Sequence, residues 1–187
     1  MLLSLMLAAG LTSALLAPTD TGDALTLHRL RSMDVTIRAT IDEGCRRSPT
    51  FAALVDHLER SSFIVYVEQV ATLRDGMRGA LLHGGAGPQY LRVLLKRGMA
   101  LEHRVVVLAH ELQHAREVVA AGVVADAVEM HALFRRIGDE RSADGERQRY
   151  ETAAALRVAD TVVADLRARR GAGQGVCHCR AGNHSTP

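Results

Sequence analysis

The chain contains 187 residues, of which 48% are hydrophobic and 24% are charged. These proportions are typical of a folded domain with a sizeable core, and they exclude a chain that is disordered throughout. The formal net charge of +2 is too balanced for a dedicated nucleic-acid binder, and the aromatic content of 3% excludes extensive base-stacking surfaces.

The N-terminus carries an uncharged apolar run from Leu2 to Ala17. A membrane span needs about 20 residues, so this run is short for a span and suits the hydrophobic region of a secretory signal. It lacks the preceding lysine or arginine that is usual in such signals. We expect residues 1–24 to form a signal peptide or an N-terminal anchor and spacer. The protein is then exported, to the periplasm or the cell exterior, and its mature part has no membrane span.

The next part of the chain predicts helices followed by strands. Helical spacing of apolar residues indicates a helix at 25–46, and Ser48 followed by Pro49 is typical of the start of a helix that runs to about residue 60. Residues 62–68, 79–83 and 90–96 predict three strands, with a turn at Asp75 and Gly76 and a loop at 84–88. Short connections favour antiparallel pairing of these strands.

After Gly98 the pattern becomes helical. We expect helices at 101–121, from there to about 137, and at 146–170, with a polar break between Gly138 and Gly145. The fold class is therefore α+β: one domain over residues 25–170, in which a small antiparallel sheet packs on helices.

Three cysteines are too few for a disulfide-rich scaffold. In an exported protein, Cys45 could pair with Cys177 or Cys179. The tail at 171–187 also offers histidines beside its cysteines, but it lacks the paired CxxC spacing of ordinary zinc sites and follows a glycine-rich segment. We expect a flexible tail rather than a folded metal site.

The segment from His110 to His114 reads HExxH and lies within the helix expected at 101–121. Residues four apart lie one turn apart on the same helix face, so the two imidazoles can bind one tetrahedral metal ion without straining the backbone. Glu111 is rotated by about 100° from His110, which lets its carboxylate reach a metal-activated water. The spacing predicts Zn²⁺ bound by His110 and His114, with Glu111 as general base.

A motif this short also arises by chance, and the two histidines then make an ordinary contact between helix turns. The surroundings favour the metal site, because the motif follows an apolar run and a predicted sheet. The segment from Leu108 to Ala115 resembles the active-site helix of zincin metallopeptidases. The resemblance extends from near Tyr90 to the last helix, and it implies that a strand beside the cleft pairs with an extended peptide.

The residues after the motif distinguish the branches of the zincins. The extended metzincin pattern needs glycine at position 117 and histidine at position 120, whereas this chain has Glu117 and Ala120. The sequence therefore resembles the gluzincins, in which a glutamate on a following helix is the third metal ligand. The downstream candidates are Glu129, Glu140, Glu146 and Glu151.

Glu151 fits the third ligand best. In the helix expected at 146–170, positions 151, 155, 158, 162 and 166 share one face and read Glu, Ala, Val, Val and Leu. A carboxylate at the head of an apolar face is costly to bury unless it is paired or bound to metal. Glu146 lies on the polar side of that helix, and the small residues after Glu151 also resemble the gluzincin pattern. The alternative is that Glu151 only interacts with the helix dipole.

Other polar residues near the motif have simpler interpretations. Glu117 shares the face of the two histidines, and we expect it to orient an imidazole rather than to bind the metal. His103 and His131 are expected to be ordinary helix residues. Tyr150 could stabilise an oxyanion, but its position beside Glu151 in the sequence does not establish its direction.

The sequence therefore predicts a gluzincin-type zinc metallohydrolase that cleaves peptide bonds of a peptide or protein substrate. His110, His114 and Glu151 bind Zn²⁺, and Glu111 is catalytic. The alternative from another class is an HExxH domain that binds metal but serves as an interaction or assembly module. A third interpretation is a helical scaffold without metal. No nucleic-acid partner is expected, and the pattern leaves the oligomeric state open.

Overall fold

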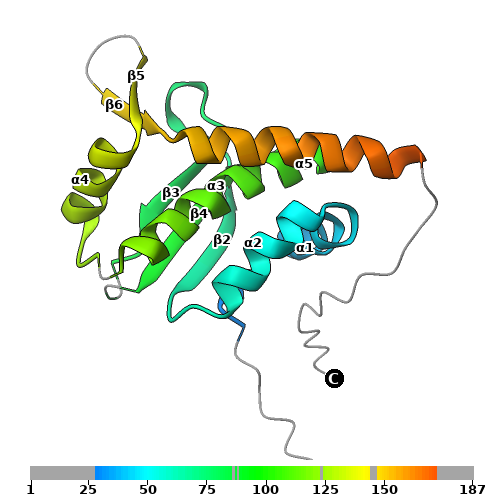
Figure 1. The fold of residues 1–187 in the computed structure, drawn as a ribbon, viewed down its shortest axis with the longest axis horizontal. Coiled ribbons are helices and arrows are strands. Elements are labelled where there is room, and N and C mark those ends of the chain that lie inside the picture. The colour runs from blue at the N-terminus through cyan, green and yellow to red at the C-terminus, as the bar shows by residue number, and fades with distance from the viewer. Residues whose placement is uncertain (1–27, 86, 88, 123, 144–146, 172–187) are drawn as a thin grey trace, which may run out of the picture.

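The computed structural model describes residues 28–85, 87, 89–122, 124–143 and 147–171 (Figure 1). The expected signal or anchor at 1–24, Cys177 and Cys179 lie outside these residues. Within the described ranges the chain forms five α-helices, a four-stranded mixed sheet and a two-stranded hairpin, which confirms the α+β class. Among the helices of this part, none is long and apolar enough to cross a membrane.

The main sheet has the strand order β1-β2-β4-β3. Its strands are β1 (Leu30–Arg31), β2 (Ile64–Val70), β3 (Gly79–His83) and β4 (Tyr90–Lys96). β2 runs parallel to β4, and β3 pairs with β4 antiparallel. The predicted antiparallel pairing is therefore confirmed for β3 and β4 and wrong for β2, and the sheet is mixed. The reason is the connection at residues 71–78. It is long enough for the chain to pass over one strand position, and β4 then inserts between β2 and β3.

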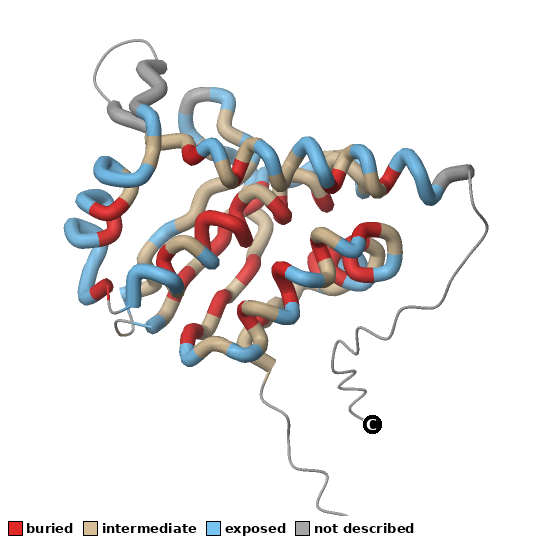
Figure 2. Tube along the Cα trace, viewed as in Figure 1, coloured by how far each residue is buried: buried red, intermediate tan, exposed pale blue. Residues whose placement is uncertain are grey.

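The two central strands supply one side of the core. Val65 and Val67 of β2 are fully buried, as are Leu91, Val93 and Leu95 of β4. These positions alternate along each strand, so their side chains point to the same face of the sheet. Figure 2 shows the buried segments gathered where this face meets the helices.

Two N-terminal helices pack together beside the sheet, α1 (Val35–Arg47) and α2 (Pro49–Glu59). The predicted start of α2 is confirmed, because the Ser48 side chain caps it by accepting from the backbone N–H of Phe51. The predicted helix at 25–46 begins too early. Asp34 caps α1 instead, and Leu30 in β1 pairs with Val65 in a parallel ladder.

The helix α3 (Leu101–Ala121) has the predicted bounds and packs against the sheet. The last helix, α5 (Ala153–Gly171), lies along α3 (Figure 1). It begins later than predicted because the preceding strand runs to Glu151 and Thr152 then caps α5, with its Oγ1 accepting from the N–H of Ala155 at 3.1 Å.

The segment between α3 and α5 folds as a helix and a hairpin. The helix α4 (Ala127–Ile137) was predicted, and its Met130 and Leu133 are buried. In place of the expected polar break, β5 (Asp139–Ala143) and β6 (Arg147–Glu151) pair as antiparallel strands. Glu151 therefore ends a strand, and it lies beside α3 rather than within the last helix.

Polar contacts fix the C-terminal half of α5 to the first two helices. The Arg47 guanidinium donates to the carbonyl of Leu166 at 2.7 Å, and the Ser48 hydroxyl donates to Asp165 Oδ2 at 2.6 Å. These contacts join segments more than a hundred residues apart in the chain. They hold α5 against the molecule while its N-terminal end meets the middle of α3.

Candidate metal centre

The middle of α3 presents the HExxH residues on adjacent turns. His114 is buried at 5% relative exposure, and His110 is half-buried. Their rings meet edge to face with centroids 4.8 Å apart, and their Nε2 atoms are 3.2 Å apart. The helical spacing alone brings these two nitrogens together, as the sequence predicted.

Glu151 completes a cluster of three potential ligands. Its Oε2 lies 3.1 Å from His110 Nε2, and the ligand atoms of Glu151, His110 and His114 all lie within 4.8 Å of one another. The cluster joins β6 to α3 across 37 residues of sequence (114 to 151). The structure therefore brings together the three residues that the sequence suggested as metal ligands.

The reason given for Glu151 from the sequence was wrong. The residue lies outside α5, so it does not head the apolar face of that helix. That face is real and starts one turn into α5, with Ala155, Val162 and Leu166 buried. The side chain of Glu151 is 27% exposed, so it is less buried than the apolar helix face on which it was predicted to lie.

The donor set fits a divalent metal such as zinc. Two imidazole nitrogens and one carboxylate oxygen are ligands that zinc accepts in catalytic sites. With metal–ligand distances of about 2.0–2.2 Å in a tetrahedron, neighbouring ligand atoms lie about 3.3–3.6 Å apart. The 3.1 Å and 3.2 Å separations around His110 Nε2 are close to that range. The cluster as a whole extends over 4.8 Å, so side-chain movements would have to bring the ligand atoms of His114 and Glu151 closer together.

Glu117 holds His114 from the side opposite the cluster. His114 Nδ1 lies 2.9 Å from Glu117 Oε2, and Glu117 Oε1 accepts from the Thr152 hydroxyl at 2.6 Å. A hydrogen bond donated by Nδ1 leaves the Nε2 lone pair of His114 available to a metal. Burial raises the pKa of Glu117, but hydrogen bonds from His114 and Thr152 outweigh it and hold the pKa below its usual value. Glu117 is thus an ionised acceptor that orients His114.

Glu111 lies on the neighbouring face of α3, against β3. It is 7% exposed, and burial raises its pKa to about 7 although the nearby His114 and His110 lower it. A Cβ added at Gly79, the first residue of β3, would lie 2.5 Å from Glu111 Oε1. Glycine at position 79 therefore leaves the space that the Glu111 carboxylate occupies.

The pKa of His110 is shifted by opposing effects. Burial lowers its pKa, but the hydrogen bond with Glu151 and the negative charges of Glu111, Glu151 and Glu117 raise it to a net value above the usual one. The surrounding carboxylates therefore favour the protonated, cationic form of His110.

The other candidates from the sequence do not join the cluster in the described residues. Glu129 accepts a hydrogen bond from the backbone of Ala125 at the start of α4. The side chain of Glu140 and the whole of Glu146 lie outside the described part. His103 accepts from Arg78, and His131 contacts the ring of Tyr150 with centroids 5.2 Å apart.

Three residues of the site were missed from the sequence. Thr152 had a usable signal, because a threonine before a run of alanines is a typical helix cap. Gly79 and Phe134 had none, since their roles depend on tertiary packing. The ring of Phe134 from α4 meets His114 edge to face at 5.2 Å and covers one side of the imidazole.

No protein-family model, no curated protein and no solved structure matches this chain. The function of the site is therefore inferred from its own residues and geometry.

Proposed function

We propose that this protein is a zinc-dependent metallohydrolase of zincin type that cleaves peptide bonds. The observation that carries the proposal is the cluster of His110, His114 and Glu151, with ligand atoms within 4.8 Å of one another beside the buried Glu111. Two histidines and one carboxylate leave a fourth coordination position open, as catalytic zinc sites require.

His110, His114 and Glu151 would hold the ion in this proposal. A zinc ion held there supplies a Lewis acid that polarises a carbonyl and lowers the pKa of water to about 7. Glu117 keeps His114 in the tautomer that the site needs, and its bond to Thr152 joins α3 to the residue that follows Glu151. The residues of the chain thus fix the donor atoms before any substrate binds.

Glu111 serves as general base and then as general acid. Its carboxylate takes a proton from the attacking water and returns it to the leaving amine. In the metal-free protein burial raises the pKa of Glu111 to about 7, and a carboxylate with a raised pKa is a stronger base toward water. Gly79 keeps β3 close to this carboxylate, so the reacting groups would lie beside the edge of the sheet.

The position of β3 supports an extended peptide as the substrate. β3 is the terminal strand of the described sheet and pairs with β4 on one side. An edge strand can add a further extended chain through backbone hydrogen bonds. A peptide paired there would pass next to Gly79 and hence next to Glu111.

The test combines metal analysis with peptide digestion. We expect about one zinc per chain after reconstitution, and cleavage of members of a mixed peptide library. Glu111→Gln should retain zinc and lose hydrolysis, because it removes the base without removing a ligand. Glu129→Gln is the matched control, since Glu129 is exposed on α4, and it should retain both. A wild-type protein that binds zinc but cleaves no peptide would instead favour the interaction module. A folded protein that binds no zinc would contradict the proposal.

A further inference from the structure

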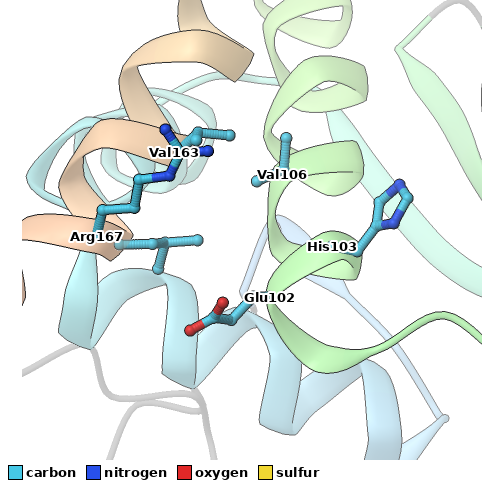
Figure 3. Close-up of a pocket in the computed structure, with 6 residues that line it drawn as sticks. Glu102, His103, Val106, Val163 and Arg167 are labelled. Carbon is cyan, nitrogen blue, oxygen red and sulfur yellow. The ribbon is translucent and has the colours of Figure 1, made fainter. Parts of the chain in front are cut away.

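A cavity of about 410 Å³ lies between α3 and α5, away from the metal ligands. Its walls come from the first two turns of α3 and from the C-terminal half of α5 (Figure 3). The lining residues are Glu102, His103, Val106, Val163, Leu166 and Arg167. The volume lies within the range of about 300–1,000 Å³ that is usual for ligand-binding pockets.

The cavity has a fixed relation to the metal centre because both use α3. Val106 precedes His110 by four residues, so it lies on the same face, about 6 Å away along the helix axis. His103 precedes His110 by seven residues, about 10 Å along the axis. An extended peptide advances by about 3.4 Å per residue. The cavity is therefore within reach of a group two or three residues from the cleaved bond.

Most of the polar groups in the cavity wall are already paired within the protein. Glu102 Oε1 accepts from the Arg47 guanidinium at 2.8 Å. Arg47 is shared with Glu43, which also pairs with Arg46, so the two carboxylates are balanced by two guanidinium groups. His103 Nε2 accepts from Arg78 at 2.6 Å, and burial together with the Arg78 charge lowers the pKa of His103, so this ring is neutral at pH 7. The remaining wall, formed by Val106, Val163 and Leu166, is apolar.

Arg167 is the exception. Figure 3 shows its guanidinium beside Val163 on the α5 wall. Within the described part of the chain, no carboxylate lies at salt-bridge distance from Arg167. Among the described residues, the lining therefore combines an apolar surface with the positive charge of Arg167, which forms no ion pair with a described carboxylate. That combination is complementary to an apolar side chain with a carboxylate next to it.

We propose that this cavity is a specificity site for the peptide substrate. The cavity binds an apolar residue of the peptide and an acidic residue next to it, and this pair lies two or three residues from the cleaved bond. This inference rests on the proposed peptidase function. Val106, Val163 and Leu166 contact the apolar side chain, and Arg167 pairs with the carboxylate.

The binding test uses the zinc-loaded Glu111→Gln protein, so that peptides are not consumed during measurement. Short capped peptides labelled with fluorescein carry a Leu–Asp, Leu–Asn, Leu–Lys or Ser–Asp pair in an otherwise identical sequence. Fluorescence anisotropy should rank Leu–Asp as the tightest binder. Arg167→Glu should weaken Leu–Asp binding about fivefold to tenfold, as reversal of an exposed charge pair predicts, and should strengthen Leu–Lys binding.

Arg157→Glu is the matched control, because Arg157 is exposed on α5 and does not line the cavity. It changes the net charge equally and should leave the ranking intact. Equal effects of the two charge reversals, no preference for Leu–Asp over Leu–Asn, or no binding of any peptide would each overturn the cavity assignment. If peptides bind with the expected ranking but the wild-type protein never cleaves them, the proposed hydrolysis fails, and the cavity remains a peptide-binding site but not a specificity site for cleavage. If the wild type cleaves peptides without regard to these pairs, the cavity assignment alone fails.

Discussion

His114 Nδ1 and Glu117 Oε2 lie 2.9 Å apart, and this contact turns the other nitrogen of the imidazole toward His110. The two residues are three apart on α3, so the helix itself supplies the pairing. Glu117 also accepts from Thr152 at 2.6 Å. One carboxylate therefore restrains His114 and the residue after Glu151 at the same time.

We predict that Glu117→Ala weakens zinc affinity about 10–100-fold, the usual effect of removing a carboxylate that orients a zinc-bound histidine. Glu117→Gln should reduce the zinc affinity less, because the amide oxygen can still accept a hydrogen bond from His114 or Thr152. Competition for zinc against a chelator of known affinity measures both variants. An affinity unchanged in Glu117→Ala would show that the contact with His114 does not orient a metal ligand.

Glu151→Ala should weaken zinc affinity far more than Glu117→Ala. It removes the third donor atom of the cluster, whereas Glu117 acts only through His114. Glu129→Ala is the control, since that carboxylate is exposed at the start of α4. Zinc titration of the three purified variants gives the order. A larger loss of zinc affinity in Glu117→Ala than in Glu151→Ala would show that β6 does not contribute a ligand to the metal centre.

The sequence predicted elements well where local signals were strong. α2 follows from Ser48 and Pro49, because a capping side chain and a proline at the first turn act within a few residues. The bounds of β3, β4 and α3 also match, since glycines or a marked change of hydrophobic period flank these segments. The helical spacing of HExxH then placed His110 and His114 together without knowledge of the tertiary fold.

Features that depend on contacts distant in sequence were not predictable in the same way. Leu30 is part of a strand because it pairs with Val65, and its own neighbours in the chain are compatible with a helix. The insertion of β4 between β2 and β3 also depends on the whole sheet. Glu151 was selected for a helical face that it does not occupy, yet the hairpin carries it to the histidines. Glu151 thus lies beside the histidines for a structural reason other than the one predicted.

Gly79→Ala should impair hydrolysis while zinc stays bound. The added Cβ would lie 2.5 Å from Glu111 Oε1 and 2.8 Å from Val107 Cγ1, so Glu111 or β3 must shift. We expect a loss of about 1–3 kcal/mol in the free energy of unfolding, as for overpacking of a well-packed site. Peptide digestion measures the hydrolysis, zinc analysis the bound metal, and urea denaturation the free energy of unfolding.

A double-mutant cycle tests whether Glu111 causes this effect. In the Glu111→Ala background, Gly79→Ala should cost less stability, because one of the two clashing side chains has been shortened. A cost that is the same in both backgrounds would mean that β3 and Val107 alone account for the strain, and Gly79 would then have no part in placing Glu111.

The metal-free protein should lose stability as pH rises from about 5 to about 8. Burial raises the pKa of Glu111 from its usual 4.5 to about 7 in the folded state. Between these two values the folded protein binds more protons than the unfolded chain, so the free energy of unfolding falls with increasing pH. Once Glu111 is fully ionised, above pH 7, the free energy of unfolding is lower by a total of the order of 3 kcal/mol. The raised pKa of His110 acts in the same direction, because its stabilising contribution is lost as pH rises through the folded pKa.

Glu111→Gln separates the contribution of Glu111 from that of His110. The amide does not titrate, so the metal-free variant should show a shallower decline than the metal-free wild type over the same pH range. Urea denaturation of both proteins in the presence of a chelator provides the comparison. Added zinc should reverse the trend in the wild type, because metal binding releases protons from the ligands and becomes more favourable as pH increases. Parallel stability curves for the two metal-free proteins would show that Glu111 titrates at its ordinary pKa and is not buried as a proton carrier requires.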